Sequence, residues 1–228
     1  MHRARSGFTV VEVALVCVVI AIIAAIAVPS WRGMRANMSL RSAAGIVNDA
    51  LSLARARAIA SGHYYVVYFN TGVGGGTDIC GNALVDANGN PAPVAVIDDG
   101  EPGSADQNCC IDAGEAVETK PAIAGVQWGA SAATVRAPGE PVAADAVYAS
   151  GSSFFDPGGA QTEWVAFRPD GVPVGFADNG GPCVLGRVGT GGGAIYLTNG
   201  DRDVATVLTS LGTTRTHSWE AAGAQWTD

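Results

Sequence analysis

The chain has 228 residues with a formal net charge of −8, and 48% of the residues are hydrophobic. This length allows one large domain or two small ones. Between Tyr64 and Asp228, six basic residues stand against nineteen acidic ones, a net charge of −13. A surface of that charge is repelled by phosphate backbones and anionic membranes at modest salt, which argues against nucleic-acid binding.

The hydrophobic residues are concentrated near the amino terminus. The run from Val13 to Val28 contains no charged residue, glycine or proline. With the residues from Phe8 to Glu12 added, it reaches about 20 residues, which as a helix span a bilayer core of about 30 Å. We therefore expect residues 8–29 to form a transmembrane helix. Arg3 and Arg5 precede it and favour a cytoplasmic amino terminus, although basic residues also follow the span.

A short basic leader, residues 1–7, precedes the apolar run and ends at Ser6-Gly7. A secretory signal peptide carries a small-residue cleavage site after its apolar run. Here Pro29, Ser30 and Trp31 follow the run instead. We expect the span to remain in the mature protein.

Glu12 is the single charged residue within the apolar run. A carboxylate inside a bilayer is costly unless it finds a partner, so Glu12 is a candidate functional residue. If the leader is removed after Gly7, the new α-amine of Phe8 lies at a similar depth. The amine of a neighbouring copy is then a suitable partner for Glu12.

Helical periodicity continues beyond Pro29 to about Ser61, so residues 30–62 are predicted to extend the same helix in amphipathic form. An apolar stripe at spacings of three and four residues requires a surface to pack on. The stripe consists of Leu40, Ala43, Val47, Leu51, Ala54 and Ala58. Gly62 is expected to end the helix.

The segment SGFTVVEVALVCVVIAIIAAIAVPSW, residues 6–31, resembles the type III signal of type IV prepilins and pseudopilins. The resemblance implies cleavage after Gly7 by prepilin peptidase, N-methylation of Phe8, an assembly role for Glu12 and a helix kink at Pro29. Val10-Val11 replaces the usual Leu-Ile before the glutamate. The resemblance also implies a bacterial inner-membrane protein that crosses the membrane once, with its carboxyl-terminal head in the periplasm.

Residues 63–228 are predicted to form a β-rich head. The predicted strands are rich in β-branched and aromatic residues. They are Tyr64–Asn70, Val94–Ile97, Ala124–Trp128, Thr162–Phe167, Ala194–Thr198, Val204–Leu211 and Thr213–Trp219. The turn-rich segments between them are long for simple connections. We expect loops inserted at about 71–121 and 138–160 to embellish a small sheet.

Two features of the head resemble the GspH/FimT family of minor pilins. The family's F-x-P-x-G turn is similar to Phe167-Arg168-Pro169-Asp170-Gly171. Its closing strands resemble Ala194–Thr198 and Val204–Trp219, with Gly212 and Arg215 in the last hairpin. The family fold is of the α+β class, type IV pilin-like. It implies a long amino-terminal helix, transmembrane in its first half, packed on a carboxyl-terminal antiparallel β-sheet head.

The cysteines predict an oxidising compartment for the head. Cys17 lies in the span, whereas Cys80, Cys109, Cys110 and Cys183 lie in the head. An even number favours two disulfides and a location outside the inner membrane. Three connectivities exist for four cysteines. A Cys109–Cys110 bond needs a strained ring, so we favour a different distant partner for each of them; free thiols or a bound metal are the alternatives.

Catalytic and ligand-binding motifs lack their minimal parts. The glycine-rich stretches carry no phosphate-loop lysine, and no G-x-S-x-G, H-E-x-x-H or C-x-x-C pattern occurs. We therefore predict no enzymatic activity and no cofactor. Asp86, Asn88 and Asn90 offer oxygen ligands at alternate positions, as in a calcium loop. Pro91 stands where such a loop needs glycine, so a solvated turn is the simpler interpretation.

These patterns together predict a structural subunit of a type II secretion pseudopilus or a type IV pilus, a minor one near the filament tip. Its expected partners are other pilins or pseudopilins, prepilin peptidase and the inner membrane. One alternative is a DNA-binding minor pilin for natural transformation, but the tail His217–Asp228 contains no lysine or arginine. Another is an adhesin-like tip pilin that binds through Asp98–Pro121.

Overall fold

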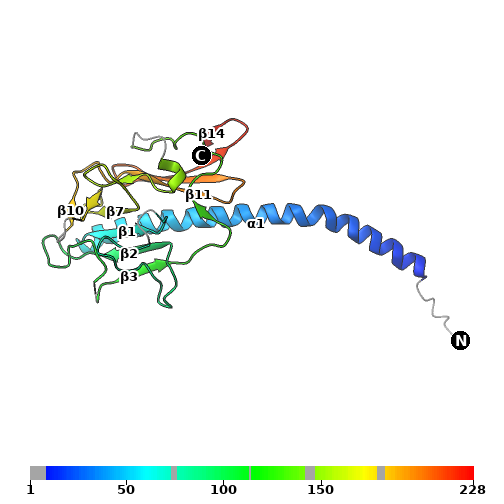
Figure 1. The fold of residues 1–228 in the computed structure, drawn as a ribbon, viewed down its shortest axis with the longest axis horizontal. Helices are drawn as coiled ribbons and strands as arrows, with labels where there is room; N and C mark the ends of the chain where they lie inside the picture. The colour runs from blue at the N-terminus through cyan, green and yellow to red at the C-terminus, as the bar shows by residue number, and fades with distance from the viewer. Residues whose placement is uncertain (1–8, 73–75, 113, 142–146, 179–182) are drawn as a thin grey trace. The chain divides into compact units, whose positions relative to one another are not determined.

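The computed structural model describes residues 9–72, 76–112, 114–141, 147–178 and 183–228. The chain forms two compact units, Met1–Met38 and Ser39–Asp228. One long helix, α1 (Val10–Ser61), runs through both units, and all the strands belong to the second unit (Figure 1). The α+β class predicted from the sequence is confirmed.

Helix α1 ends where the sequence predicts. The Gly62 amide donates a hydrogen bond to the Ala58 carbonyl at 3.0 Å, and Gly62 has a φ of 77°. Glycine adopts this left-handed conformation without a Cβ clash, which makes it a common helix terminator. The helix is continuous across Pro29, so the proline does not break it.

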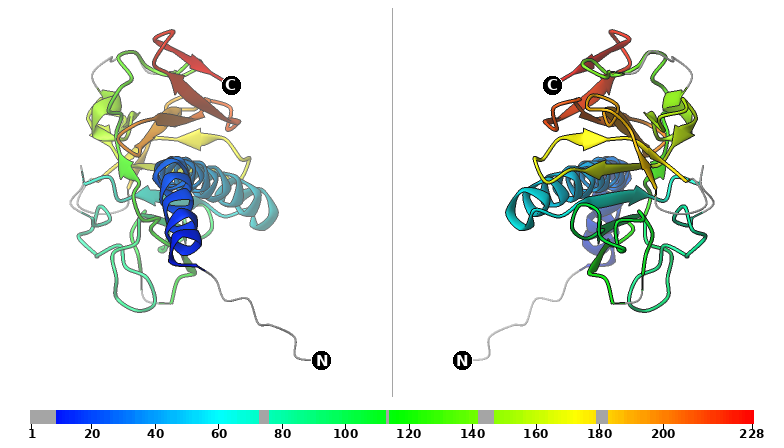
Figure 2. Two further views of the ribbon diagram at one scale, coloured as in Figure 1. Left: turned by 90° about the vertical axis from the view of Figure 1, so that its right-hand side faces the viewer. Right: turned by 90° about the vertical axis from the view of Figure 1, so that its left-hand side faces the viewer.

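The apolar stripe of the second half of α1 is confirmed as a core face. All six of its residues are buried, with exposed fractions between 0% and 9%. They share one apolar cluster with side chains of two different β-sheets. The helix therefore lies between two sheets, with strands on both of its sides in Figure 2.

The first five-stranded sheet is antiparallel and is built around the segment that follows the helix. Its order is β3 (Val117–Lys120), β2 (Val94–Asp98), β1 (Tyr65–Phe69), β7 (Trp164–Phe167) and β8 (Pro173–Val174). Val67 and Phe69 of β1 face the helix, whereas Val66 and Tyr68 face a second cluster that contains Cys109. Both faces of this strand are buried, so its sequence is apolar throughout rather than alternating.

The second five-stranded sheet contains the carboxyl-terminal strands. Its order is β14 (Gln225–Thr227), β13 (Thr214–Glu220), β12 (Asp203–Leu208), β11 (Gly193–Thr198) and β4 (Gln127–Trp128). Ile195 and Leu197 of β11 face α1, and Tyr196 faces a third cluster that includes Trp219 and Trp226.

Small elements complete the second unit. They are the pairs β5 (Phe154–Phe155) with β6 (Gln161–Thr162) and β9 (Phe176–Ala177) with β10 (Val184–Leu185), and the 3₁₀ helix η1 (Val147–Ser150).

The head is built on more than one small sheet. The structure has two five-stranded sheets, and β3 lies inside the segment expected to be an inserted loop. This strand reads Val-Glu-Thr-Lys and lies at a sheet edge, where polar side chains reach solvent, so its sequence carries no apolar signal. The predicted strand Ala124–Trp128 is shorter than expected, because only Gln127–Trp128 pairs with β11.

Asp203, at the start of the central strand β12, binds the segment that follows the edge strand β4 of the second sheet. Its carboxylate accepts hydrogen bonds from the amides of Ser131, Ala132 and Ala133 at 3.0, 2.7 and 2.7 Å. Burial acts to raise the pKa of Asp203, but these hydrogen bonds together with that of Thr198 lower it below the ordinary value. The ionised carboxylate thus fixes the segment that follows β4.

The protein is expected to lose stability in acid through Asp203. A carboxyl group with a lowered pKa in the folded state contributes stability above the unfolded pKa of about 4, and this contribution is lost as the pH falls through the folded pKa. Asp203→Asn should cost about 3 kcal/mol at pH 7, because an amide NH₂ then faces buried N–H donors. Urea unfolding at pH 7, 5 and 3.5 measures both effects. The exposed neighbour Asp201 provides the control Asp201→Asn, and equal losses in the two variants would contradict the assignment.

Candidate functional site

The amino-terminal half of α1 is an uncovered apolar surface. The window Val10–Ala27 has a mean hydropathy of 3.1, and none of it is buried. Among the described residues it is the one helical window long and apolar enough to cross a membrane. Its large side chains are between 46% and 86% exposed. Within the predicted span 8–29, residues 10–27 therefore form an apolar surface that the described part of the chain leaves uncovered.

Glu12 lies in the first turn of this surface and caps its own helix. The Thr9 amide and hydroxyl donate to Glu12 Oε2 at 2.9 and 3.0 Å, and the Glu12 amide donates to Thr9 Oγ1 at 3.3 Å. This reciprocal pattern is a capping box, which satisfies amides left unpaired at a helix start. Glu12 is among the residues predicted from the sequence and Thr9 is not, although Thr followed three residues later by Glu is the sequence signature of that motif.

The predicted cleavage residues Gly7 and Phe8 lie outside the described residues. Their roles in processing and methylation stay predictions, as does the helix kink at Pro29.

The four head cysteines pair in two disulfides. Cys80 pairs with Cys110 and Cys109 with Cys183, each with a Cα–Cα distance of 5.7 Å. The adjacent cysteines thus take different distant partners, the connectivity that the sequence favours. Cys17 is free and exposed.

The disulfide region is organised by buried carboxylates. Asp78 is 4% exposed and accepts hydrogen bonds from the amides of Cys80, Asn82 and Ile111 at distances of 2.7 to 2.9 Å. Asp99 is fully buried and accepts from the Cys109 amide at 2.5 Å. The loops that carry these cysteines contain few large apolar side chains. Disulfides and charge-assisted hydrogen bonds therefore define their conformation.

The calcium candidates form a self-contained turn. Asp86 Oδ1 accepts from the amides of Asn88 and Asn90 at 2.8 and 2.9 Å, and these hydrogen bonds, first that of Asn90, lower the pKa of Asp86. The turn joins the bridge partners Val85 and Pro91. Among the described residues, the one cluster of three His, Cys, Asp or Glu ligand atoms is elsewhere, at Asp99, Cys109 and Cys183.

The two turns that resemble the GspH/FimT pattern meet at the end of α1. In the Phe167–Gly171 turn, the Gly171 amide donates to the Arg168 carbonyl at 2.7 Å. Arg55 of α1 donates through Nη1 to the Gly212 carbonyl at 2.7 Å. A Cβ on Gly212 would lie 2.8 Å from the Gly171 carbonyl oxygen, so the two turns require glycine at their contact. Sequence reasoning identified the turns but not Arg55, which lies 157 residues away from Gly212.

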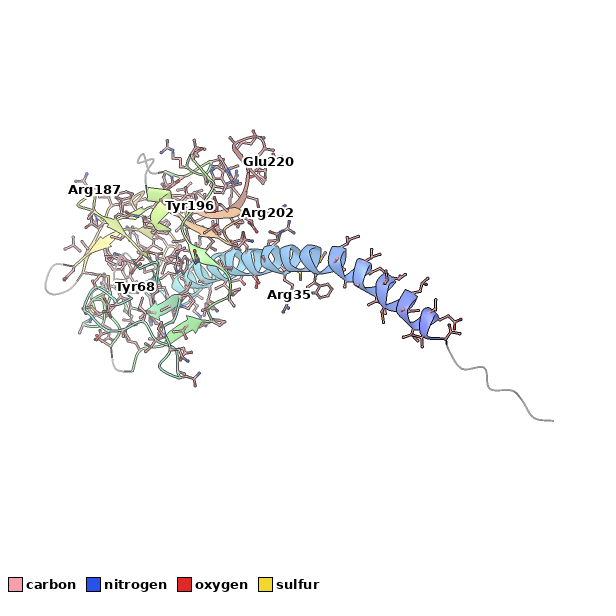
Figure 3. All side chains as sticks on the ribbon, turned by 45° about the vertical axis from the view of Figure 1, so that its right-hand side comes forward. Arg35, Tyr68, Arg187, Tyr196, Arg202 and Glu220 are labelled. Atoms are coloured by element: carbon pink, nitrogen blue, oxygen red, sulfur yellow. A yellow bond between two sulfur atoms is a disulfide. The ribbon has the colours of Figure 1, made fainter. Side chains whose placement is uncertain are left out.

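The basic residues of the head are scattered or paired with acidic residues. Arg57 and Lys120 both bind Glu118, and Arg168 lies 3.1 Å from Asp170. Figure 3 shows Arg187 and Arg202 in separate regions of the head.

The carboxyl-terminal hairpin of β13 and β14 carries acidic residues near its ends. His217 Nδ1 lies 2.8 Å from Asp228 Oδ1, and Glu220 is exposed. Arg215 on β13 is exposed on the same sheet. The described residues therefore provide no continuous basic surface on this hairpin.

Comparison of the chain with protein-family models, with curated proteins and with solved structures finds no match, so its functional assignment depends on the residues described above.

Proposed function

We propose that this protein is a minor pilin or pseudopilin, a membrane-anchored subunit that leaves the inner membrane and joins a helical filament. The observation that carries the proposal is the change in environment along one helix. Window Val10–Ala27 is entirely unburied, whereas the stripe that begins at Leu40 lies in the core between two sheets. The first half needs a cover that the described residues do not supply, and lipid or the helices of other subunits provide one.

Glu12 supports assembly over permanent anchoring. The capping box with Thr9 does not require a charge, since glutamine forms it as well, and a carboxylate is costly for a simple membrane anchor because of its burial in lipid. In an assembled bundle of helices, the amine of Phe8 from a neighbouring subunit supplies the opposite charge. The preference for that partner sets the register, since only a correctly staggered neighbour places its amine beside Glu12.

The disulfide-linked head supports a position outside the cytoplasm. Two disulfides within one domain are stable in an oxidising compartment such as the periplasm. This agrees with the orientation favoured by Arg3 and Arg5, which places the amino terminus in the cytoplasm. The long loops, tied by Cys80–Cys110 and Cys109–Cys183, favour a minor subunit over one that packs densely along the whole filament.

The charge distribution argues against the DNA-binding alternative. Affinity for DNA depends on releasing counterions from several phosphates at once, which needs a cluster of basic residues. Arg57, Lys120 and Arg168 are each held by an acidic neighbour. The structural role is therefore the better supported one.

Amino-terminal sequencing by mass spectrometry tests the proposal. We expect the mature protein, purified from envelopes that contain prepilin peptidase, to begin at N-methyl-Phe8. Gly7→Val should block processing almost completely, because the peptidase must accommodate the residue before the scissile bond. Ser6→Ala is the control and should be processed normally. A mature chain that begins near Ser30 would contradict the proposed function.

A further inference from the structure

A buried carboxyl group lies beside one of the two disulfides. Asp99 follows β2 and is 0% exposed, as is Cys109, and Cys183 is 9% exposed. One carboxylate oxygen of Asp99 and the sulfur atoms of Cys109 and Cys183 all lie within 4.8 Å of one another. Because the two sulfurs are bonded to each other, the cluster is a disulfide with a neighbouring carboxyl group, not a set of metal ligands.

The backbone of Cys109 is attached to this carboxyl group. Asp99 Oδ1 accepts hydrogen bonds from the amides of Cys109 at 2.5 Å and Asn108 at 3.2 Å. Cys109 has a φ of 62°, a left-handed conformation that non-glycine residues rarely adopt, so these hydrogen bonds hold a strained backbone in place. The other oxygen, Oδ2, is buried and has no hydrogen-bond partner among the described residues. One oxygen therefore positions the cysteine and the other remains able to accept a proton.

The surroundings keep this group reactive near neutral pH. Burial, followed by the negative charges of Glu115 and Asp112, raises the pKa of Asp99 to about 7, despite the opposing hydrogen bonds from Cys109 and Asn108. From β1, the Tyr68 hydroxyl approaches the same region and donates to the Cys109 carbonyl at 2.6 Å. A group with a pKa close to the ambient pH is well suited to accept and return a proton.

We propose that Asp99 is the general base for closure of the Cys109–Cys183 disulfide during oxidative folding. The oxidant is a small disulfide such as oxidised glutathione. The Cys183 thiolate, the more exposed of the two, attacks the oxidant, forms a mixed disulfide and releases one thiolate. Asp99 then takes the proton of the Cys109 thiol, directly or through one water. The Cys109 sulfur attacks Cys183 and expels the second thiolate, which is protonated from solvent. Two protein thiols are oxidised and one glutathione disulfide is reduced to two thiols.

The second disulfide provides an internal control. Cys80 is exposed, Cys110 is 2% exposed, and no carboxylate among the described residues forms a comparable cluster with their sulfur atoms. A burial penalty on thiol ionisation falls on Cys109 and Cys110 alike. Asp78 accepts hydrogen bonds from the Cys80 and Ile111 amides, but its oxygens do not cluster with the sulfur atoms of Cys80 and Cys110 as those of Asp99 do with Cys109 and Cys183. The two bonds should therefore respond differently to a change at Asp99.

The experiment measures closure of both bonds in the full chain in detergent micelles. The protein is reduced, transferred into oxidised glutathione and quenched by alkylation at intervals. Peptide mapping separates the two bonds, because the Cys109–Cys110 peptide joins either the Cys80 or the Cys183 peptide. Asp99→Asn keeps an oxygen that accepts the Cys109 amide and removes the proton acceptor. The matched control is Asp98→Asn, since Asp98 points to the opposite face and binds His63 and Tyr65.

We expect Asp99→Asn to slow closure of Cys109–Cys183 roughly 100-fold at pH 7 and to change Cys80–Cys110 less than twofold. The reverse reaction, reduction of the native protein by dithiothreitol, should slow as well, because the same group returns the proton. A purely structural role for Asp99 predicts the opposite sign, since a loosened site is reduced faster. Faster reduction, equal slowing of both bonds, or slowing of Cys109–Cys183 by less than tenfold would overturn the proposal.

Discussion

Replacing Glu12 with valine is expected to reduce incorporation into filaments at least tenfold, while leaving membrane insertion intact or improved. Valine removes the only charge of an unburied apolar window, so the helix partitions more readily into lipid. It also removes the group that recognises the amine of a staggered neighbour. A tenfold loss of incorporation corresponds to about 1.4 kcal/mol of assembly free energy. This is well below the free energy that the wild type gains when the Glu12 carboxylate finds a partner in hydrocarbon. Cross-linking of the head to neighbouring subunits measures incorporation, and alkaline extraction of membranes measures insertion.

The structure adds a control that the sequence motif alone does not suggest. Because Glu12 also caps its own helix through Thr9, loss of assembly in Glu12→Val has two explanations. Glu12→Gln separates them, since glutamine still forms a capping box but carries no charge. We expect Glu12→Gln to fail in assembly as Glu12→Val does. Normal incorporation of the glutamine variant would show that capping, and not charge pairing, is the role of this residue.

Loss of the Cys109–Cys183 disulfide is expected to cause the largest loss of stability. The bond closes a loop with a sequence separation of 74 residues, which in the chain-entropy model contributes about 4 kcal/mol. The double variant Cys109→Ala/Cys183→Ala should therefore unfold about 10 °C below the wild type, given the size of the second unit. Thermal unfolding of the full chain in detergent, followed by circular dichroism, measures the shift.

Cys17→Ala provides the matched control for this variant. Cys17 is free and exposed, so its replacement removes a sulfur without removing a cross-link, and the unfolding temperature should remain within 2 °C or so of the wild-type value. If the double variant and Cys17→Ala unfold at the same temperature, the disulfide contributes nothing to the stability of the head.

The sequence by itself determined the features that depend on local periodicity. Apolar spacing of three and four residues specified the buried face of α1, and a glycine at the predicted position ends the helix. The buried strands β1, β2, β11 and β12 were predicted because they are rich in β-branched and aromatic residues. The uncovered apolar helix and its single carboxylate were predicted for the same reason, because composition and spacing determine them without any knowledge of neighbours.

Tertiary structure alone decided which surfaces meet. The apolar sequence of a strand indicates that the strand is buried, but not which element buries it. The division into two sheets around α1 was therefore not predictable. The sequence of edge strand β3 did not indicate a strand, because its side chains are polar. The strand forms through backbone pairing with β2. The contact of Arg55 with Gly212 and the approach of Asp99 to Cys183 join residues that are distant along the chain. Such contacts form only after the loops between them have closed, and local sequence patterns do not encode that closure.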